Sequence, residues 1–403
     1  MHQPLGKSSG SATRAIAFLA VAGFAAQAMV RVTDSLLPQI AADFSESVGA
    51  TSIVVTAYLL AHGSVQLIIG PIGDRFGKYR VVAVAAACAT VMVALCGLAS
   101  SLPLLVAARL GSGLATGWVI PFAMAFVGDV IPYEGRQQVL GRYLSGQILG
   151  QLFGQAAGGV LGEYFGWRNV FFILAAMLGI ATVLLFIELW RNPVTRASRP
   201  PTPTETGFAA SYSAVLRSSW ARTIILAVFL ESALMFGAFT YVGADLHLRF
   251  GLDFAAVGLF VGAFAIGGLI YSFSVKLMVV RLGQAGLATS GGILLAIGFL
   301  ALAIEPHFYV APFAITIVGL GFYMLHNTLQ TNATQMTPEA RGTAIGLFSA
   351  ALYLGQTAGV AGAAMLFDRY HGVPLFLIAS VTLLALGLWV ASRLRRRELS
   401  VGA

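Results

Sequence analysis

The stretch Gly70-Pro-Ile-Gly-Asp-Arg-Phe-Gly-Lys-Tyr-Arg80 decides the fold, because it separates two long apolar runs with a short, charged and glycine-rich segment. Each flanking run is long enough to cross a hydrocarbon core of ~30 Å, which takes about 20 helical residues. Gly70 and Gly73 allow close backbone approach, and Gly77 permits the positive φ of a tight reversal. The charged side chains need water or headgroups, so both flanking helices are predicted to end on the same side of a membrane.

Composition excludes a soluble protein. Of the 403 residues, 58% are apolar and only 10% are charged, and the mean hydropathy is +0.84, whereas soluble proteins carry about 25% charged residues. The net charge of +8 does not indicate nucleic acid, because the basic residues lie at the ends of apolar runs. Cys88 and Cys96 lie on one such run, which implies neither a disulfide framework nor a metal site.

The order of apolar runs predicts an all-α membrane protein in two halves. Residues 191–220 are rich in proline, arginine, serine and threonine and are predicted to form a solvated cytoplasmic linker. The predicted domains are therefore an N-terminal six-helix half at 1–190, this linker, and a C-terminal six-helix half at 221–403. The twelve expected spans are 15–37, 51–72, 80–100, 104–128, 140–162, 169–190, 221–244, 254–279, 286–304, 309–334, 343–366 and 374–392.

Charge asymmetry predicts the orientation. With the N-terminus inside, most of the 24 Lys and Arg residues fall in cytoplasmic segments. The outer segments keep only Arg168, Arg249 and Arg369. By the positive-inside rule both termini are predicted to be cytoplasmic.

An internal repeat supports the division into halves. Matching residues recur at a nearly constant spacing, which chance alone does not produce over this many positions. A shift of 205 residues places Arg136 on Arg341, Gly141 on Gly346, Gly150 on Gly355, Gln151 on Gln356 and Gly154 on Gly359. A shift of 206 residues places Phe44 on Phe250, Arg75 on Arg281 and Gly77 on Gly283.

The pattern Gly-x-x-x-Asp-Arg-x-Gly-Lys/Arg-x-Arg at 70–80 resembles the signature loop between helices 2 and 3 of major facilitator superfamily transporters. This resemblance implies the major facilitator fold, with twelve transmembrane helices in two pseudo-symmetric six-helix halves and a substrate cavity between them. The second copy, Val280-Arg281-Leu-Gly283, keeps Arg and Gly but lacks the aspartate.

Three further elements resemble those of proton-coupled drug antiporters with twelve helices. Helix 1 ends in Asp34-x-x-x-Pro38, and helix 4 carries Arg109-Leu-Gly-Ser-Gly113, with Ser112 where such antiporters have glutamine. Helix 5 reads Gly150-x-x-x-Gly154-Gln155-x-x-Gly158-Gly159, with Gln155 in place of the expected proline. Together these elements favour an exporter.

Ionisable residues inside the predicted spans are candidates for proton coupling, because such residues cost about 2.5–3.5 kcal/mol each on insertion scales. Asp34 and Arg109 fall at similar depths, so we expect Asp34 to bind the proton and Arg109 to be its charge partner. Arg31 lies one turn deeper on the same face and competes for that carboxylate. The alternative is a headgroup-level pair that anchors helix ends. Glu231, near the middle of helix 7, is expected to bind a second proton or a cationic substrate.

Polar residues within other spans are expected to line the substrate cavity. Gln147, Gln151 and Gln155 recur every four residues and share one stripe of helix 5, which lipid would penalise; hydrogen bonding between helices is the alternative. The remaining candidates are His62, Tyr58, Tyr241, Asn327, Gln330 and Gln356.

The opening stretch is expected to act as a gating loop made of Gly70, Gly73, Asp74, Arg75 and Gly77. Asp74 is predicted to face the positive N-terminus of helix 11 near Pro338, an interaction of about 0.3–1 kcal/mol. Arg136, from the next cytoplasmic loop, is a second expected partner.

The sequence thus predicts a secondary active transporter, a proton-coupled exporter (antiporter) of small amphiphilic or drug-like compounds by alternating access. The alternative is a proton symporter of a sugar or organic acid, to which Arg31 and Arg109 would be suited. A membrane enzyme is disfavoured, because no metal spacing, phosphate loop or nucleophile elbow is evident. A receptor is disfavoured, because it would not require an intact switching loop or matched charges within the membrane. No cofactor is expected beyond a proton gradient. The expected partners are a small-molecule substrate, protons and lipid, with no nucleic acid, for a monomer spanning a bacterial-type inner membrane several times.

Overall fold

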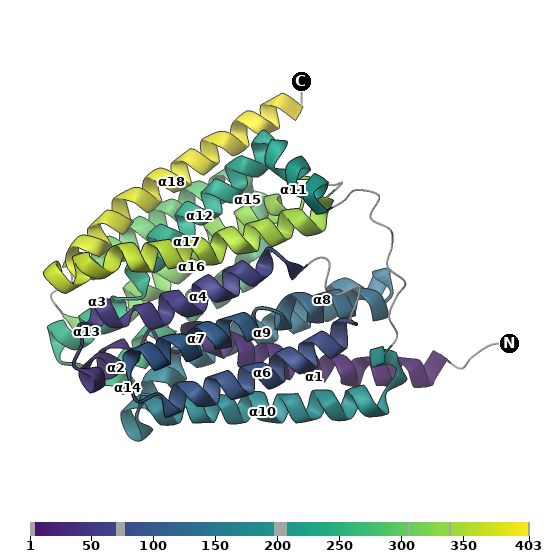
Figure 1. Ribbon diagram of the computed structural model, residues 1–403. Helices are drawn as coiled ribbons and strands as arrows, with labels where there is room; N and C mark the ends of the chain where they lie inside the picture. Colours follow the sequence, from purple (N-terminus) through teal and green to yellow (C-terminus); the bar gives the residue numbers. More distant parts are fainter. Residues whose placement is uncertain (1–4, 70–76, 197–207, 305–306, 338–339, 402–403) are drawn as a thin grey trace.

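A computed structural model describes residues 5–69, 77–196, 208–304, 307–337 and 340–401. In these ranges every regular element is a helix (Figure 1). The first half contains α1 (Leu5–Arg31), α2 (Leu37–Phe44), α3 (Val48–Thr51), α4 (Ile53–Gln66), α6 (Lys78–Leu98), α7 (Leu102–Thr116), α8 (Val119–Val130), α9 (Tyr133–Phe165) and α10 (Trp167–Arg191). The second half contains α12 (Ser219–Phe239), α13 (Val242–Phe250), α14 (Phe254–Gly262), α15 (Phe264–Ile304), η2 (Phe308–Val310), α16 (Ala311–Ala333), α17 (Arg341–Tyr370) and α18 (Gly372–Val401).

Ten segments of the described residues are long and apolar enough to cross a membrane. One of them, Phe254–Ile304, has 51 residues and would measure about 75 Å as a single helix. It contains a break at Gly283, where φ is 62° and ψ is −178°. The 33-residue α9 is not among the ten. Dividing Phe254–Ile304 at Gly283 and adding α9 gives twelve spans, the number expected from the sequence.

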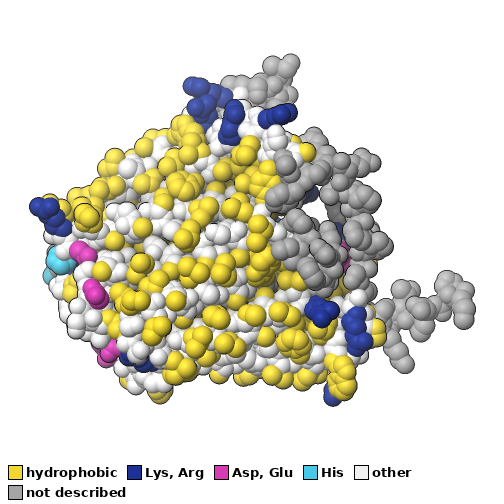
Figure 2. Space-filling view, in the orientation of Figure 1, with side chains coloured by type: hydrophobic (Ala, Val, Ile, Leu, Met, Phe, Trp, Pro, Cys, Tyr) yellow, Lys and Arg dark blue, Asp and Glu magenta, His cyan; other side chains and the backbone are white. Residues whose placement is uncertain are grey.

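The surface of the bundle suits a lipid environment. On the face drawn in Figure 2, hydrophobic side chains cover the flank, and the Lys, Arg, Asp, Glu and His side chains gather near the two ends. Fully exposed apolar residues such as Phe273 (88%) and Val280 (84%) are expected where lipid tails rather than water surround a helix.

The segment between the halves is partly helical, although the sequence predicts only a solvated linker. Pro193–Arg196 forms a 3-10 turn, η1, and Phe208–Arg217 forms α11. The Tyr212 hydroxyl donates to the backbone carbonyl of Leu67 in the first half. Burial there raises the pKa of Tyr212 above its usual value, and the phenol is the donor because a carbonyl oxygen can only accept.

The internal repeat reappears as repeated helix packing. A Cβ atom on Gly150 or Gly154 of α9 would meet the carbonyl oxygen of Phe24 or Ala28 in α1. In the second half, Gly355 and Gly359 of α17 face the carbonyl oxygens of Phe229 and Ala233 in α12 in the same way. All four glycines and all four carbonyl residues are related by the shift of 205. Small residues at these positions let the helix backbones approach closely.

The two halves meet at the end of the bundle opposite both chain termini, which we call the distal end. There α2 and α3 of the first half lie near α13 and α14 of the second (Figure 1). Gly159 of α9 packs directly against Gly258 of α14.

Candidate functional site

A break in the first helix positions the central ion pair. Residues 32–36 form turns between α1 and α2, and Pro38 lies at the start of α2. At this break the Arg31 Nη1 atom lies 3.3 Å from the Asp34 Oδ2 atom. Both side chains are only 1% exposed, so the protein encloses the pair, and a headgroup-level anchor is not what the geometry describes. The Asp34 Oδ1 atom has no hydrogen-bond partner among the described residues.

Arg31 also connects the two halves. Its Nη2 atom donates to Gln356 Oε1 on α17, and Nη1 lies 3.4 Å from the Thr240 hydroxyl, at the end of α12. The guanidinium carbon lies 3.7 Å from the centre of the Phe236 ring, a cation–π contact. A change in the charge of Asp34 therefore acts on a residue that touches the second half.

Arg109 does not pair directly with Asp34, so the expected partnership is corrected. Its Nε atom donates to the Val54 carbonyl at 3.1 Å, Nη1 to the Met29 carbonyl at 3.2 Å and Nη2 to the Thr33 hydroxyl at 3.4 Å. The side chain is fully buried. All of these acceptors belong to the first half, so Arg109 holds α7 against α1 and α4.

A second buried acid lies in the other half. Glu231 of α12 is 0% exposed, and its Oε2 atom lies 2.8 Å from Nδ1 of His326 on α16. The His326 ring stacks on Phe322 at 4.9 Å and lies 5.7 Å from Phe348. The Glu231 Oε1 atom has no hydrogen-bond partner in the described part of the chain. A carboxylate and an imidazole, both of which can bind protons, are thus in direct contact inside the second half.

The glutamine stripe of α9 is only partly buried. Gln147 is 5% exposed and Gln155 is 1% exposed, and the Nε2 atom of each has no partner among the described atoms. Gln151, between them, is half-buried. Gln147 and Gln155 thus lie in the interior of the bundle, and neither Nε2 atom makes an interhelical hydrogen bond among the described residues.

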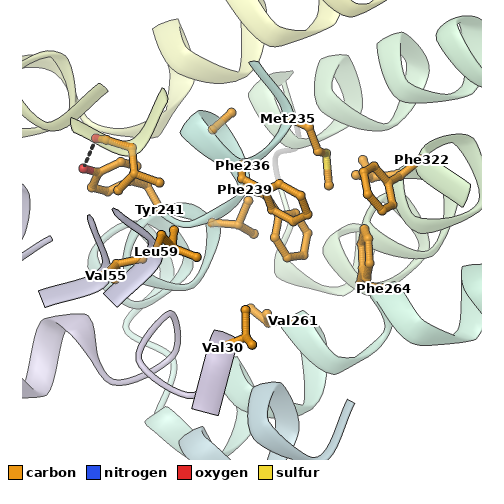
Figure 3. Packing of buried hydrophobic residues seen from close by; sticks show 14 of the residues in the cluster. Val30, Val55, Leu59, Met235, Phe236, Phe239, Tyr241, Val261, Phe264 and Phe322 are labelled. Carbon is orange, nitrogen blue, oxygen red and sulfur yellow. Dashed lines mark hydrogen bonds between the residues drawn. The ribbon is translucent and has the colours of Figure 1, made fainter. Parts of the chain in front are cut away.

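The aromatic candidates divide into two groups. Tyr58 and His62 both contact the Thr116 hydroxyl, at 2.7 Å and 3.3 Å, and His62 also packs on Tyr353 of the second half at 4.3 Å. Tyr241 instead donates its hydroxyl to the Val360 carbonyl at 2.9 Å within the second half. Figure 3 shows Tyr241 inside the apolar cluster beside Val55 and Leu59 of the first half.

The remaining candidates on α16 and α17 differ in how far they are buried. Gln356 is buried and accepts from Arg31. Asn327 is half-buried, and Gln330, one turn further along α16, is exposed. Only Gln356 among these three therefore contacts the central pair directly.

Most of the expected gating loop, from Gly70 to Arg75, lies outside the described residues, as does Pro338. Gly77 has a φ of 81°, the region that glycine tolerates best. Arg136 donates to the Ile131 carbonyl at 3.3 Å and 3.1 Å.

Two site residues were not singled out from the sequence. Thr240 and Phe236 contact Arg31, and each is an ordinary apolar or small polar residue of a spanning helix. The repeat relates one of them to the site, because a shift of 205 places Arg31 on Phe236, whereas Thr240 falls on Ser35. In the described residues, no three His, Cys, Asp or Glu side chains lie together as metal ligands would.

Comparison with known proteins agrees with this architecture. The sequence profile of the Major Facilitator Superfamily matches residues 19–360. The chain belongs to the major facilitator superfamily. It is therefore a multi-pass membrane transporter rather than an enzyme, as the sequence predicts.

The similar proteins carry names that point to different functions. The chain is 27% identical to the uncharacterized transporter YceJ of Bacillus subtilis over 83% of this chain and 84% of that protein. It is 28% identical to the riboflavin transporter RibZ of Clostridioides difficile over 39% and 34% of the two chains. It is 25% identical to the multidrug resistance protein fnx1 of Schizosaccharomyces pombe over 57% and 46%.

A solved structure shares the fold. The bacterial homologue of the human lysosomal transporter Spinster, in an inward-facing and unoccupied conformation, superposes with a TM-score of 0.74. The two chains are 18% identical over 97% of this chain and 98% of that one.

Proposed function

We propose that this transporter exports small amphiphilic compounds in exchange for protons, and that Asp34 carries the coupled proton. The observation that carries the proposal is the position of Arg31, which bonds to Asp34 and, at the same time, to Gln356 and Thr240 of the other half. A proton on Asp34 therefore changes a contact between the halves, and alternating access requires the halves to move against each other.

Electrostatics gives the direction of the effect. An ionised Asp34 balances the Arg31 charge in a water-poor environment. A protonated Asp34 leaves the Arg31 guanidinium without its counter-charge, which is unfavourable in a buried site. The halves are then expected to rearrange so that Arg31 gains water or another acceptor. Protonation thus favours a second conformation, which is the requirement for coupling.

The Glu231–His326 pair is the second proton-binding candidate. It lies wholly in the second half, between α12 and α16, and touches no charged group of the first half in the described residues. Its protonation is expected to act on packing around Phe322 and Phe348 rather than on the contact that Arg31 makes. We assign the principal coupling to Asp34 and a supporting role to Glu231.

The organic-acid symporter is the competing proposal, and the arginines argue against it. An anionic substrate needs free donors, but Arg31 already bonds to Asp34, Gln356 and Thr240. Arg109 is bonded to three acceptors of the first half. Substrate would have to displace these contacts. The multidrug name of one relative supports export, and the riboflavin name of another keeps the substrate class open.

Inverted membrane vesicles test the function. With an imposed pH gradient, a panel of lipophilic cationic, neutral and anionic dyes is followed by fluorescence, and an uncoupler is then added. We expect gradient-dependent uptake of amphiphilic dyes that the uncoupler abolishes. Asp34→Asn should abolish the gradient-driven part and keep downhill exchange. Asp43→Asn is the matched control, because Asp43 pairs with Arg168 at an exposed position. Gradient-driven transport by Asp34→Asn with unchanged pH dependence would refute the assignment.

A further inference from the structure

Two acidic side chains join the halves at the distal end. Asp368, near the end of α17, accepts a hydrogen bond from the Ser47 hydroxyl at 2.6 Å and one from the Gly49 backbone N–H at 2.7 Å. Glu163, near the end of α9, accepts from the Phe254 backbone N–H at 2.8 Å. In each contact the carboxylate belongs to one half and the donors belong to the other.

These two contacts are related by the internal repeat. The shift of 205 residues that aligns the halves places Glu163 on Asp368 and Gly49 on Phe254. The same carboxylate-to-amide contact is therefore made twice, once from the first half to the second and once in the reverse direction. A chance surface contact would have no reason to obey the repeat.

Each carboxylate meets the first turn of a helix. The α3 helix has Ser47 as its N-cap, and α14 begins at Phe254 with Asp253 as its N-cap. Backbone N–H groups at helix starts lack partners within the helix and carry partial positive charge, so a carboxylate is favoured there. Glu163 and Asp368 are both exposed. Water can therefore replace either carboxylate, which suits a contact that must break and re-form.

Glycines allow this approach. A Cβ atom on Gly49 would collide with the Ala364 carbonyl oxygen and the Asp368 carboxylate. A Cβ atom on Gly258 would meet the Ala156 carbonyl oxygen at 2.7 Å and the Gly159 Cα at 2.8 Å. The halves thus touch at both carboxylate contacts without intervening side chains.

We propose that Glu163 and Asp368 hold the distal end closed and thereby set the conformational equilibrium of the transport cycle. They are positioning residues, because they touch no buried charge of the candidate site. Losing them favours conformations in which α2 and α3 separate from α13 and α14. The inference goes beyond the proposed function and holds whatever the substrate is.

The experiment measures the distance between the halves. Both native cysteines are replaced by serine, and spin labels are attached at Ala42 of α2 and Leu248 of α13, two exposed distal positions on different halves. Pulsed electron paramagnetic resonance spectroscopy of the protein in lipid bilayers then gives the distribution of distances between the two labels. From it we take the ratio of molecules with the labels far apart to molecules with the labels close together. Because losing the charge of a carboxylate at a helix N-terminus typically shifts an equilibrium about two- to fivefold, Asp368→Asn and Glu163→Gln should each raise that ratio by about that factor. The double variant should raise it by about the product.

Asp253→Asn is the matched control, because Asp253 is an exposed carboxylate at the same helix end but accepts from Ala256 within its own half, at 2.6 Å. It should leave the ratio unchanged. Asp368→Glu, which keeps a carboxylate, should restore most of the close population. Gly49→Val, which keeps both carboxylates, should raise the separated population by steric collision.

An unchanged ratio in the Asp368→Asn, Glu163→Gln double variant would overturn the proposal. Equal shifts in Asp253→Asn would do so as well, because they would indicate a general charge effect. The measurement needs no substrate or proton gradient, so its failure is distinguishable from failure of the proposed exchange activity. A melting temperature equal to that of the parent separates conformational shift from unfolding.

Discussion

At the scale of single residues, the two buried arginines have separate tasks. Arg31 reaches across the interface to Gln356 and Thr240, whereas Arg109 bonds only within its own half. Both have the same charge and similar burial. The two side chains differ in their hydrogen-bond acceptors. Because of this difference, Arg31 is expected to respond to protonation of Asp34, whereas Arg109 is expected to hold helices together.

Arg109→Lys is therefore expected to lower stability. A lysine carries one ammonium group on a flexible stem and cannot reproduce the planar, divergent donors of arginine. Leaving the Val54 or Met29 carbonyl without this donor should cost about 1–3 kcal/mol. The melting temperature in detergent measures the loss. Arg142→Lys, at an exposed position of α9, is the control, and equal melting temperatures for the two variants would contradict this role of Arg109.

Glu231→Gln tests the second acid. The amide keeps the shape of the carboxylate and can still bond to His326, but it cannot exchange a proton. We expect transport to persist with fewer protons moved per substrate, because Asp34 still couples. Comparing the substrate gradient sustained by a fixed pH gradient gives that ratio. A ratio equal to that of the parent would mean that the Glu231–His326 pair is structural.

At the scale of helices, glycines bring α9 and α17 into close contact with their neighbours. Gly154 faces the Ala28 carbonyl, and Gly359 faces the Ala233 carbonyl. Gly146, on the same α9 helix, has nothing within 4 Å of an added Cβ. One helix thus offers a packed glycine and an open glycine for direct comparison.

Gly154→Val should force α9 away from α1 and destabilise the protein by about 1–3 kcal/mol, as overpacking does. Gly146→Ala should be neutral, or stabilising by up to about 1 kcal/mol, since alanine favours a helix over glycine. Thermal unfolding in detergent compares the two variants. A neutral Gly154→Val would show that α9 and α1 do not pack through this stripe.

Sequence periodicity predicts the close helix contacts but not every residue contact of the site, and the reasons are physical. The glycine spacing and the shift of 205 identify the close helix contacts, because both are properties of the chain itself. Which of the two arginines bonds to Asp34 could not be predicted, because depth along a helix does not specify rotation; in the structure it is Arg31, at the turns over 32–36. The Asp368 contact with Gly49 was also missed, since an exposed acid at a helix end looks like any other surface residue until the halves are brought together.

At the scale of the whole molecule, both chain termini are predicted to lie in the cytoplasm. Twelve spans place both termini on the same side of the membrane, and the concentration of Lys and Arg in the inner segments indicates that this side is the cytoplasm. A fluorescent protein that matures only in the cytoplasm, fused after Ala403, should fluoresce. Alkaline phosphatase at the same position should be inactive. Active phosphatase there would imply an odd number of spans and would contradict the division of Phe254–Ile304 at Gly283.

The central claim is that the charge of Asp34 controls the contact between the halves. The most direct test measures the distance between spin labels at Ala42 and Leu248 from alkaline to acidic pH, with Asp43→Asn as the control. In the parent and in the control, acidification is expected to change the ratio of separated to close distances. In Asp34→Asn the ratio should stay near the acidic value at every pH. Any pH dependence that remains in this variant should disappear when Glu231→Gln is added. Full parental pH dependence in Asp34→Asn would contradict the account.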